Sequence, residues 1–405
     1  MASEFGVAAS FNTAAVYIRT PTITSPVDGQ LDVSLSATLT GDDFSVYGGN
    51  DEHVASRWQY STVPDFSTVL IDSGWVASPL KSYSPSVTIP RKTRLYGRLK
   101  YKGKLLGESE WSQVVSFVTA DQLKGIYTQK ASGPTIVSFG LMVEIGGDIY
   151  LTGGSSKLET WKYSPAQNSW TQLANALAYI YETESAAVID GKLYVCGATG
   201  PSRSKRLYRY NPQNNTWADL GAAPGESAGC YMGAIGGKLY LFGGRGYSNI
   251  GSTSMHEYDP GTGLWTQKTA LPSTGRYDVA GGVIGGKLYI AGGIRDGSMG
   301  GTSRADTWSY EPSLDKWTQL ASMPWAKYLA AGAVVDGRLY VDGGNNSDGS
   351  YGGSLLMYDP VANGWAEIQN NLRTQNRRDH AAVGVGSKMY IYCAVGTAGT
   401  LYQVE

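Results

Sequence analysis

The chain has 405 residues, with 33 basic and 34 acidic side chains, a formal net charge of −1 and 42% hydrophobic residues. This length suits two or three domains, and the near-neutral charge does not favour a polyanionic partner such as nucleic acid. The 53 glycines, 28 tyrosines and 11 tryptophans exclude a disordered, collagen-like or helical-bundle protein and favour short strands joined by tight turns.

The N-terminal part divides into an arm and a strand-rich module. Residues 1–20 show no clear period, and we interpret them as an extended arm. They contain no basic region and no continuous apolar stretch, so we expect no signal peptide. Residues 21–120 contain short runs of strand-forming residues, and these predict an immunoglobulin-like β-sandwich with Trp58 in its core. The candidate strands are 36–39, 57–61, 69–72, 83–89, 95–101 and 114–118.

This module resembles fibronectin type III and bacterial immunoglobulin-like modules in residues 24–29, 95–99 and 110–112. The fuller pattern, which includes residues 58–61 and 65–66, is similar to modules of bacteriophage tail proteins. The resemblance implies that the arm and the sandwich attach to, or space apart, other virion proteins.

From residue 121 onward the chain repeats itself. An apolar-Gly-Gly-Lys-Leu-Tyr pattern recurs at intervals of 44 to 51 residues, and a tryptophan recurs seven residues after a second tyrosine. Each unit contains four strand-like segments, two of which are joined by a Gly-Gly or Asp-Gly turn typical of hairpins. Four antiparallel strands in ~50 residues predict one blade of a β-propeller. The first tyrosines are Tyr150, Tyr194, Tyr240, Tyr289, Tyr340 and Tyr390, and the tryptophans are Trp170, Trp217, Trp265, Trp317 and Trp365.

The glycine doublet, the tyrosine and the tryptophan that follows it resemble kelch repeats over roughly residues 125–405. The sixth unit ends before its tryptophan strand, but Tyr127 precedes Tyr150 by 23 residues, and the tryptophans precede the next such tyrosine by 23 to 25. We therefore predict an all-β chain whose residues 121–405 form a six-bladed propeller. Residues 126–130 supply the last strand of the sixth blade and so close the ring, which leaves no free sheet edge.

Candidate binding residues lie where the innermost strand of each unit begins, 13 residues before its tyrosine. Blades four to six place the cations Arg276, Lys327 and Arg377 there, and Arg378 and His380 follow in the sixth. Such a basic crescent at the mouth of the axial channel would bind a carboxylate or a phosphate. The alternative is structural, because the neighbouring Asp278 and Asp379 could neutralise Arg276 and Arg377 in ion pairs between blades.

The longest connections lie between the second and third strands of the units, at residues 246–254, 294–306 and 345–354. In a propeller these connections share the face on which the innermost strands begin. They could carry a variable binding surface, or they could be insertions that the scaffold tolerates.

Chemistry-bearing residues are sparse. The three histidines cannot supply the two histidines and two tyrosines that a copper oxidase on a kelch propeller needs, and zinc sites fail for the same reason. The cysteines Cys196, Cys230 and Cys393 are too few for a disulfide framework and lack metal-ligand spacing, so we expect free, packed thiols. We predict no catalytic residue, no metal and no cofactor. The kelch resemblance leaves a sugar epimerase open, with Glu182 or Glu184 and Arg276 or Arg377 as its acid–base candidates.

Together these features predict a non-enzymatic bacteriophage virion protein, namely a tail fibre, appendage or decoration protein. Its propeller would bind a host-surface glycan or protein, and its arm and sandwich would contact other virion proteins. We expect neither nucleic-acid binding nor membrane insertion, and we expect the protein to be made in the host cytoplasm and located in the virion. A bacterial adhesin or carbohydrate-binding protein and a kelch-type sugar epimerase are the alternatives.

Overall fold

The computed structural model divides the chain into two compact units, residues 1–122 and 123–405. Both consist of strands and connections. The residues that the structure describes are 15–33, 38–85, 89, 91–134, 140–154, 157–179, 181–199, 204–225, 228–246, 249–296, 302–346, 352–370, 377, 380–395 and 398–405. Within them, no helix is long and apolar enough to cross a membrane.

The first unit contains two sheets that share one hydrophobic core. The larger sheet has five strands in the order β3–β10–β9–β6–β7, and the smaller has the order β2–β4–β8. Trp58 of β6 is fully buried at the centre of this core, as the sequence predicted. The bounds are β2 (Ile23–Ser25), β3 (Gln30–Val33), β4 (Leu39–Gly41), β6 (His53–Ser61), β7 (Val69–Val76), β8 (Ser82–Tyr83), β9 (Arg94–Gly103) and β10 (Val115–Thr119).

Two details of this unit differ from the sequence expectations. Strand β1 (Tyr17–Ile18) pairs with β5 (Val46–Tyr47), and Ile18 is buried in the core, so these two residues of the predicted arm belong to a sheet. The strand expected at 36–39 begins at Leu39, and residues 36 and 37 lie outside the described part of the chain.

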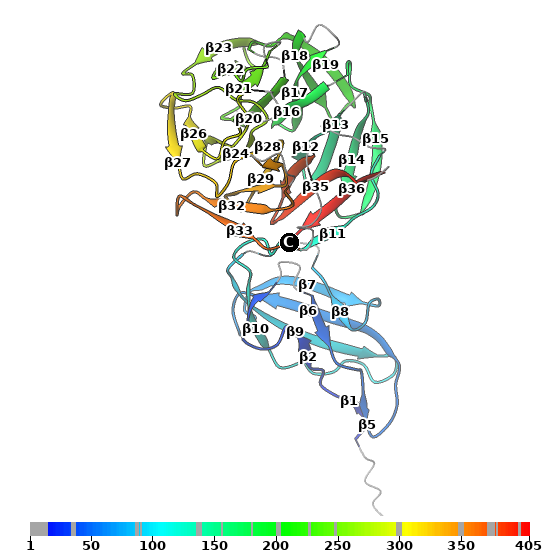
Figure 1. The fold of residues 1–405 in the computed structure, drawn as a ribbon. Coiled ribbons are helices and arrows are strands. Elements are labelled where there is room, and N and C mark those ends of the chain that lie inside the picture. Colours follow the sequence, from blue (N-terminus) through cyan, green and yellow to red (C-terminus); the bar gives the residue numbers. More distant parts are fainter. Residues whose placement is uncertain are drawn as a thin grey trace, which may run out of the picture. The chain divides into compact units, whose positions relative to one another are not determined.

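The second unit is a β-propeller, in which four-stranded antiparallel sheets surround a central axis (Figure 1). The described residues contain six such sheets, which we number as blades 1 to 6 in chain order. Their innermost strands contact one another in a closed circle, β12–β16–β20–β24–β29–β34–β12.

Each blade lists its strands from the axis outward. Blade 1 is β12 (Gly140–Ile145), β13 (Asp148–Gly153), β14 (Thr160–Ser164) and β15 (Ser169–Leu173); blade 2 is β16 (Tyr181–Ile189), β17 (Lys192–Thr199), β18 (Ser204–Asn211) and β19 (Thr216–Ala222). Blade 3 is β20 (Ala228–Ile235), β21 (Lys238–Arg245), β22 (Met255–Asp259) and β23 (Leu264–Lys268); blade 4 is β24 (Ala280–Ile284), β25 (Lys287–Ala291), β26 (Thr307–Glu311) and β27 (Lys316–Leu320). Blade 5 is β29 (Ala331–Val335), β30 (Arg338–Asp342), β32 (Leu355–Asp359) and β33 (Gly364–Ile368); blade 6 is β34 (Ala381–Val385), β35 (Lys388–Val395), β36 (Ala398–Val404) and β11 (Tyr127–Gln129).

Blade 6 joins the two ends of the propeller sequence. Strand β11 pairs with β36 so that Tyr127 lies opposite Val404, just as Trp170 lies opposite Tyr163 in blade 1. Tyr127 therefore occupies the tryptophan position, as its spacing predicted. The same register corrects one assignment, because Val404 and not Tyr402 takes the place of the third-strand tyrosine.

Neighbouring blades are held together at their outer edge by a repeated contact that we call the clamp. An Asn or Asp two residues before the tryptophan accepts a backbone N–H from the preceding blade at 2.8–3.0 Å. The indole N–H of the tryptophan donates to the carbonyl of that same preceding residue at 2.9–3.1 Å. The clamps join Asn168 and Trp170 to Ala131, Asn215 and Trp217 to Ala174, Asp315 and Trp317 to Thr269, and Asn363 and Trp365 to Ala321.

All five tryptophans pack into hydrophobic clusters that combine residues of two adjacent blades. Trp317 is the most buried of them, at 5% exposure, and its ring lies against Phe242 of blade 3 and Tyr310 of blade 4. The predicted structural role of the repeat tryptophan is therefore confirmed.

Candidate functional site: the axial cavity and the buried cations around it

The innermost strands of all six blades enclose a cavity of about 370 Å³. This volume falls in the range of small-ligand pockets. Most of the wall consists of Gly, Ala and Val, and polar side chains enter it at Glu144, Ser185, Tyr231, Asp278 and His380. The cavity is therefore a largely apolar chamber with a few polar groups.

Small residues are needed here because the inner strands approach one another closely. A Cβ added to Gly332 would lie 2.5 Å from the backbone nitrogen of Gly281 in the preceding blade. One added to Gly384 would lie 2.0 Å from the carbonyl oxygen of Val334. Glycine at these positions lets the strand backbones form the wall of the cavity themselves.

Equivalent residues just before the inner strands link successive blades. Gly229, Asp278 and Leu329 each lie 11 residues before a repeat tyrosine, and each has a positive φ, between 54° and 68°. The Asp278 N–H donates to the Gly229 carbonyl at 2.9 Å, and the Leu329 N–H donates to the Asp278 carbonyl at 3.3 Å. This relay fixes Asp278 where its side chain can line the cavity.

Arg276 does not face solvent. Its side chain is fully buried, and its guanidinium forms a two-bonded ion pair with Asp306, with both N–O distances at 2.9 Å. Burial alone would raise the pKa of the Asp306 carboxyl, but the hydrogen bonds and the charge of Arg276 bring this pKa below its ordinary value. Arg276 therefore ties the start of the inner strand of blade 4 to the residue before β26 of the same blade.

Lys327 is also buried, at 1% exposure, and belongs to the short strand β28 (Lys327–Tyr328), which pairs with β31 (Asn345–Asn346). Its ammonium donates to the carbonyl of Gly343 at 2.5 Å. Ser354 stands in blade 5 where Asp306 stands in blade 4, so the lysine lacks the equivalent carboxylate. Burial consequently lowers the pKa of Lys327 to about 8.

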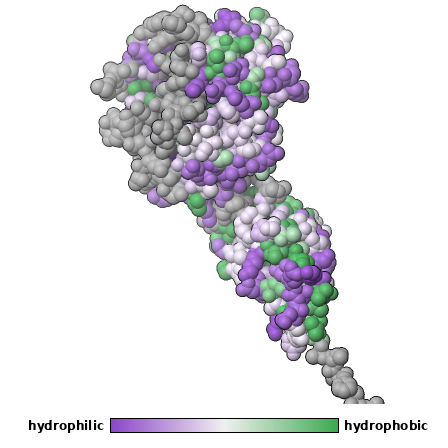
Figure 2. Space-filling view, turned by 90° about the vertical axis from the view of Figure 1, so that its right-hand side faces the viewer, coloured by the Kyte–Doolittle hydropathy of each residue, from purple (hydrophilic) through white to green (hydrophobic). Residues whose placement is uncertain are grey.

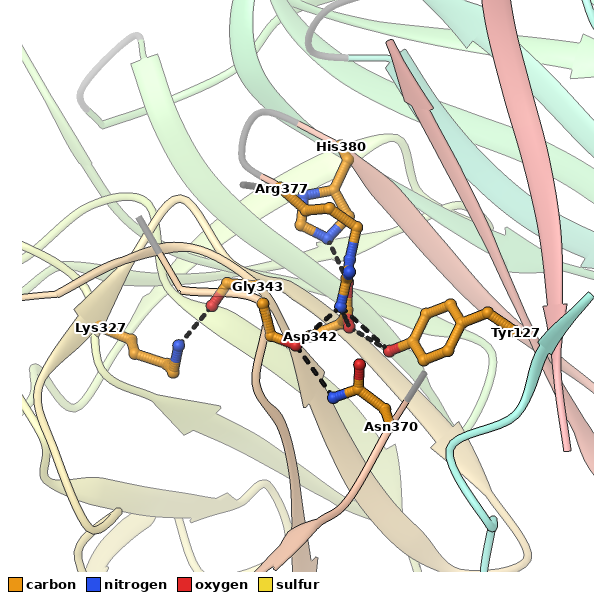
Figure 3. A network of polar contacts seen from close by, with 8 residues as sticks. Tyr127, Lys327, Asp342, Gly343, Asn370, Arg377 and His380 are labelled. Carbon is orange, nitrogen blue, oxygen red and sulfur yellow. Dashed lines mark hydrogen bonds and ion pairs between the residues drawn. The ribbon is translucent and has the colours of Figure 1, made fainter. Parts of the chain in front are cut away.

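Arg377 and His380 meet on one buried carboxylate, Asp342 at the end of β30 (Figure 3). The Arg377 guanidinium donates to both carboxylate oxygens, at 2.8 and 2.7 Å, and the Nε2 atom of His380 lies 3.0 Å from one of them. The hydroxyl of Tyr127 also donates to Asp342. Burial opposes ionisation of Asp342, but the charge and hydrogen bonds of Arg377 and the bond with His380 keep the pKa of its carboxyl well below the ordinary value.

His380 has a second polar atom with a different environment. The residue lines the axial cavity, its side chain is fully buried, and its Nδ1 has no hydrogen-bond partner among the residues that the structure describes. When Nε2 of the neutral imidazole donates to Asp342, Nδ1 is an acceptor. The Asp342–His380 pair thus holds one unused acceptor beside the cavity.

The predicted basic crescent takes a different form in the structure. Arg276, Lys327 and Arg377 begin equivalent inner strands as expected, but all three are buried and bonded within the protein rather than presented at a mouth. The structural alternative also named the wrong partners, because the carboxylates are Asp306 and Asp342 and not Asp278 and Asp379. Four of the positions considered, Val137, Ser227, Arg378 and Asp379, lie outside the described residues, as do the side chains of Tyr181, Glu182 and Glu184.

Sequence reasoning missed Asp342, although a signal for it existed. It lies two residues after a repeat tyrosine, where the other blades place Thr152, Cys196, Phe242, Ala291 and Tyr392. A carboxylate at a buried second-strand position requires a cationic or hydrogen-bonding partner. Within the described residues, no group of three or more His, Cys, Asp or Glu side chains is placed to hold a metal ion.

The outer surface differs from the cavity wall. In the view of Figure 2, hydrophilic side chains spread over the described part of the propeller edge, with smaller hydrophobic groups between them. Mixed polarity of this kind is ordinary for a solvent-facing surface. The cavity is therefore the better candidate site.

The comparisons with known proteins agree on the repeat. A model of the KLHDC2/KLHL20/DRC7 Kelch-repeats domain matches residues 185–394, about half of the chain. Kelch-like protein 15 of Danio rerio is 30% identical over 241 residues, which cover 53% of this chain and 38% of that protein. Kelch-like protein 23 of Homo sapiens is 26% identical over 299 residues, which cover 69% of this chain and 50% of that protein.

A solved structure has the same fold. The structure of YjhT superposes with a TM-score of 0.59 at 19% identity, and the match covers 68% of this chain and 96% of that chain. In contrast, the chain spans half or less of the length of the Kelch-like proteins that it matches.

Proposed function

Because the chain belongs to the kelch-repeat family, we propose that it is a non-enzymatic binding module whose axial cavity receives a small polar group of its ligand. The resemblance to kelch repeats that the sequence predicted is confirmed by this family match. The observation that carries the proposal is the cavity of about 370 Å³ beside which Nδ1 of His380 lacks a partner. We also propose that six blades complete the ring.

The polar groups of the cavity favour a ligand that donates hydrogen bonds. His380 Nδ1 is an acceptor in the neutral imidazole, and Asp278 adds a carboxylate to the same wall. Sugar hydroxyls are donors of suitable size, and an apolar wall with a few polar groups suits a ring with one apolar face. A terminal sugar of a host-surface glycan is therefore the ligand that we propose.

The buried cations support this site indirectly. Arg276 and Arg377 each spend their guanidinium on a carboxylate of the protein, and these pairs fix the connections around the mouth of the cavity. We assign them a positioning role and not direct contact with the ligand.

The test is a glycan array probed with the full-length chain and three variants. D278N keeps a residue type that tolerates a positive φ, and H380Q keeps a donor toward Asp342. We expect both to weaken binding at least about tenfold, the loss that accompanies removal of one good hydrogen bond to a charged or buried group. K316Q, on the exposed outer strand β27, should bind like the parent.

Retention of parental affinity in folded D278N and H380Q would move the binding surface away from the cavity, toward the connections that precede β22, β26 and β32.

The finer assignment, a tail fibre, appendage or decoration protein of a bacteriophage virion, stays a proposal. It is supported by the first unit, whose three-stranded and five-stranded sheets have the strand orders of an immunoglobulin-like sandwich with a buried tryptophan. The named Kelch-like relatives are vertebrate proteins and lend the virion no support. Mass spectrometry of purified virions tests it, and absence of the chain from them would favour a bacterial adhesin.

One observation favours a second candidate, an acid–base enzyme acting on sugars. A buried carboxylate that orients an imidazole is the arrangement by which a histidine base is held in one tautomer. The Asp342–His380 pair has this arrangement, 3.0 Å apart, at the edge of the cavity. Incubation with reducing sugars and sialic acids, followed by nuclear magnetic resonance, should show epimer or anomer exchange only if this candidate is correct.

A further inference from the structure

Two of the six junctions between blades lack the residues of the clamp. Glycine stands in place of the Asn or Asp at Gly263, in the turn before β23 of blade 3, and at Gly125, before β11 of blade 6. Glycine has no side-chain oxygen to accept the N–H of the preceding blade. The junctions between blades 2 and 3 and between blades 5 and 6 therefore need another connection.

At the junction of blades 5 and 6, that connection is the Asp342–His380 pair. Asp342 lies two residues after the repeat tyrosine of blade 5, and His380 lies ten residues before that of blade 6. The same two positions at the junction of blades 2 and 3 are Cys196 and Cys230. Because the register of the first and second strands is the same in these blades, Cys196 and Cys230 face one another as Asp342 and His380 do.

Direct contacts agree with this equivalence. Strands β17 and β20, which carry the two cysteines, lie in contact, and both cysteines belong to one buried cluster. The hydroxyl of Ser185, opposite Cys196, accepts the N–H of Met232 at 2.6 Å and so fixes blade 2 beside Cys230. The Cys196 side chain forms a hydrogen bond with the Cys230 sulfur, and this bond, together with the charge of Lys205, lowers the pKa of the Cys230 thiol to about 6 although burial opposes it.

The two thiols also differ in access. Cys196 is fully buried, whereas Cys230 lines the axial cavity and is 5% exposed. A small disulfide reagent entering the cavity would meet Cys230 first. With its lowered pKa, the Cys230 thiol is largely ionised near neutral pH and is the better nucleophile.

We propose that Cys196 and Cys230 are a site of covalent modification, at which a low-molecular-weight disulfide oxidises them to a bond between blades 2 and 3. The Cys230 thiolate attacks the disulfide, forms a mixed disulfide and releases one thiolate, which takes a proton from solvent. Cys196 then loses its proton to solvent and attacks the Cys230 sulfur, and a second thiol leaves. The reagent is reduced to two thiols and the protein loses two hydrogens, so the bridge replaces the missing clamp.

The experiment uses the full-length chain after incubation with oxidised glutathione, both as the native protein and during refolding from denaturant in a glutathione buffer. Alkylation with N-ethylmaleimide under denaturing conditions and peptide mapping then locate the free thiols. We expect one alkylated cysteine, Cys393, and a linked pair of peptides containing Cys196 and Cys230. Closing this loop should raise the thermal midpoint of the propeller by roughly 5–10 °C relative to the reduced protein.

Cys393 provides the matched control, because it is also buried and free in the structure. The C393S variant should show the same bridge and the same rise, whereas C230A should show neither. Three alkylated cysteines in both the native and the refolded oxidised parent would overturn the proposal, and so would a linked peptide that contains Cys393.

Discussion

At the scale of single residues, Lys327 shows what it costs to bury a charge without a carboxylate partner. Its pKa is about 8 in the folded protein against 10.5 for an ordinary lysine. Between these values the unfolded chain binds more protons, so this residue makes stability rise with pH. The burial penalty is fully present below about pH 8 and disappears above about pH 10.5.

We therefore predict that the unfolding free energy of the parent, relative to K327M, rises by up to about 3 kcal/mol between pH 8 and pH 10.5. Denaturant titrations at several pH values measure this difference, in which the other titrating groups cancel. The exposed lysine variant K316M should show no such trend. A pH-independent difference for K327M would mean that Lys327 is not desolvated as described.

Asn215 shows how a single turn residue joins two blades. Its side-chain oxygen accepts the Tyr210 hydroxyl at 2.7 Å and the Ala174 N–H at 2.8 Å, and its φ is 55°. N215G preserves the backbone but removes the acceptor, so we expect a loss of about 1–3 kcal/mol. N215D should be nearly neutral, because Asp315 already serves in the clamp of blade 4. Equal losses in thermal or denaturant unfolding of the two variants would refute a role for the acceptor.

At the scale of elements, the short strand β11 completes blade 6 from the other end of the sequence. It pairs with β36, and backbone hydrogen bonds from Lys124 and Lys130 to Glu405 and Leu401 flank this pairing. Ala131, just beyond the strand, is clamped by blade 1. Removing the segment would leave the backbone groups of β36 unpaired and expose one face of the blade.

We predict that a fragment of residues 123–405 folds, whereas one of residues 132–405 is insoluble or melts far below it. Circular dichroism during heating compares the two fragments, and addition of a peptide of residues 123–134 should partly restore the second. A cooperative, equally stable 132–405 fragment would show that blade 6 does not need β11.

At the scale of the whole molecule, the two units have separate cores. The cluster around Trp58 contains residues up to Phe117, whereas the propeller clusters begin at Leu123. Unfolding of one core should therefore leave the other intact. We expect W58A to cost the first unit about 3–5 kcal/mol while the unfolding transition of the propeller keeps its midpoint.

Calorimetry and hydrogen-exchange mass spectrometry separate the two transitions, and W317A should give the converse result. A single transition that moves as one in both variants would contradict this division of the chain.

The sequence alone determined the repeat, the propeller and the place of Tyr127, because hairpin register keeps the spacing from strand to strand nearly constant. It misplaced the third strand of blade 6, where Val404 replaces the expected tyrosine and no aromatic marks the register. It also located Arg276, Lys327 and Arg377 at equivalent positions.

Only the tertiary structure decided what those positions do. The cations turn inward to Asp306, to the Gly343 carbonyl and to Asp342, which lie 16 to 35 residues away along the chain. Likewise, Cys196 meets Cys230, and His380 meets Asp342, across a junction between blades. The physical reason is that strand spacing is set by local pairing, whereas the partner of a buried side chain depends on how separate blades pack around the axis, where desolvation selects the nearest compatible group.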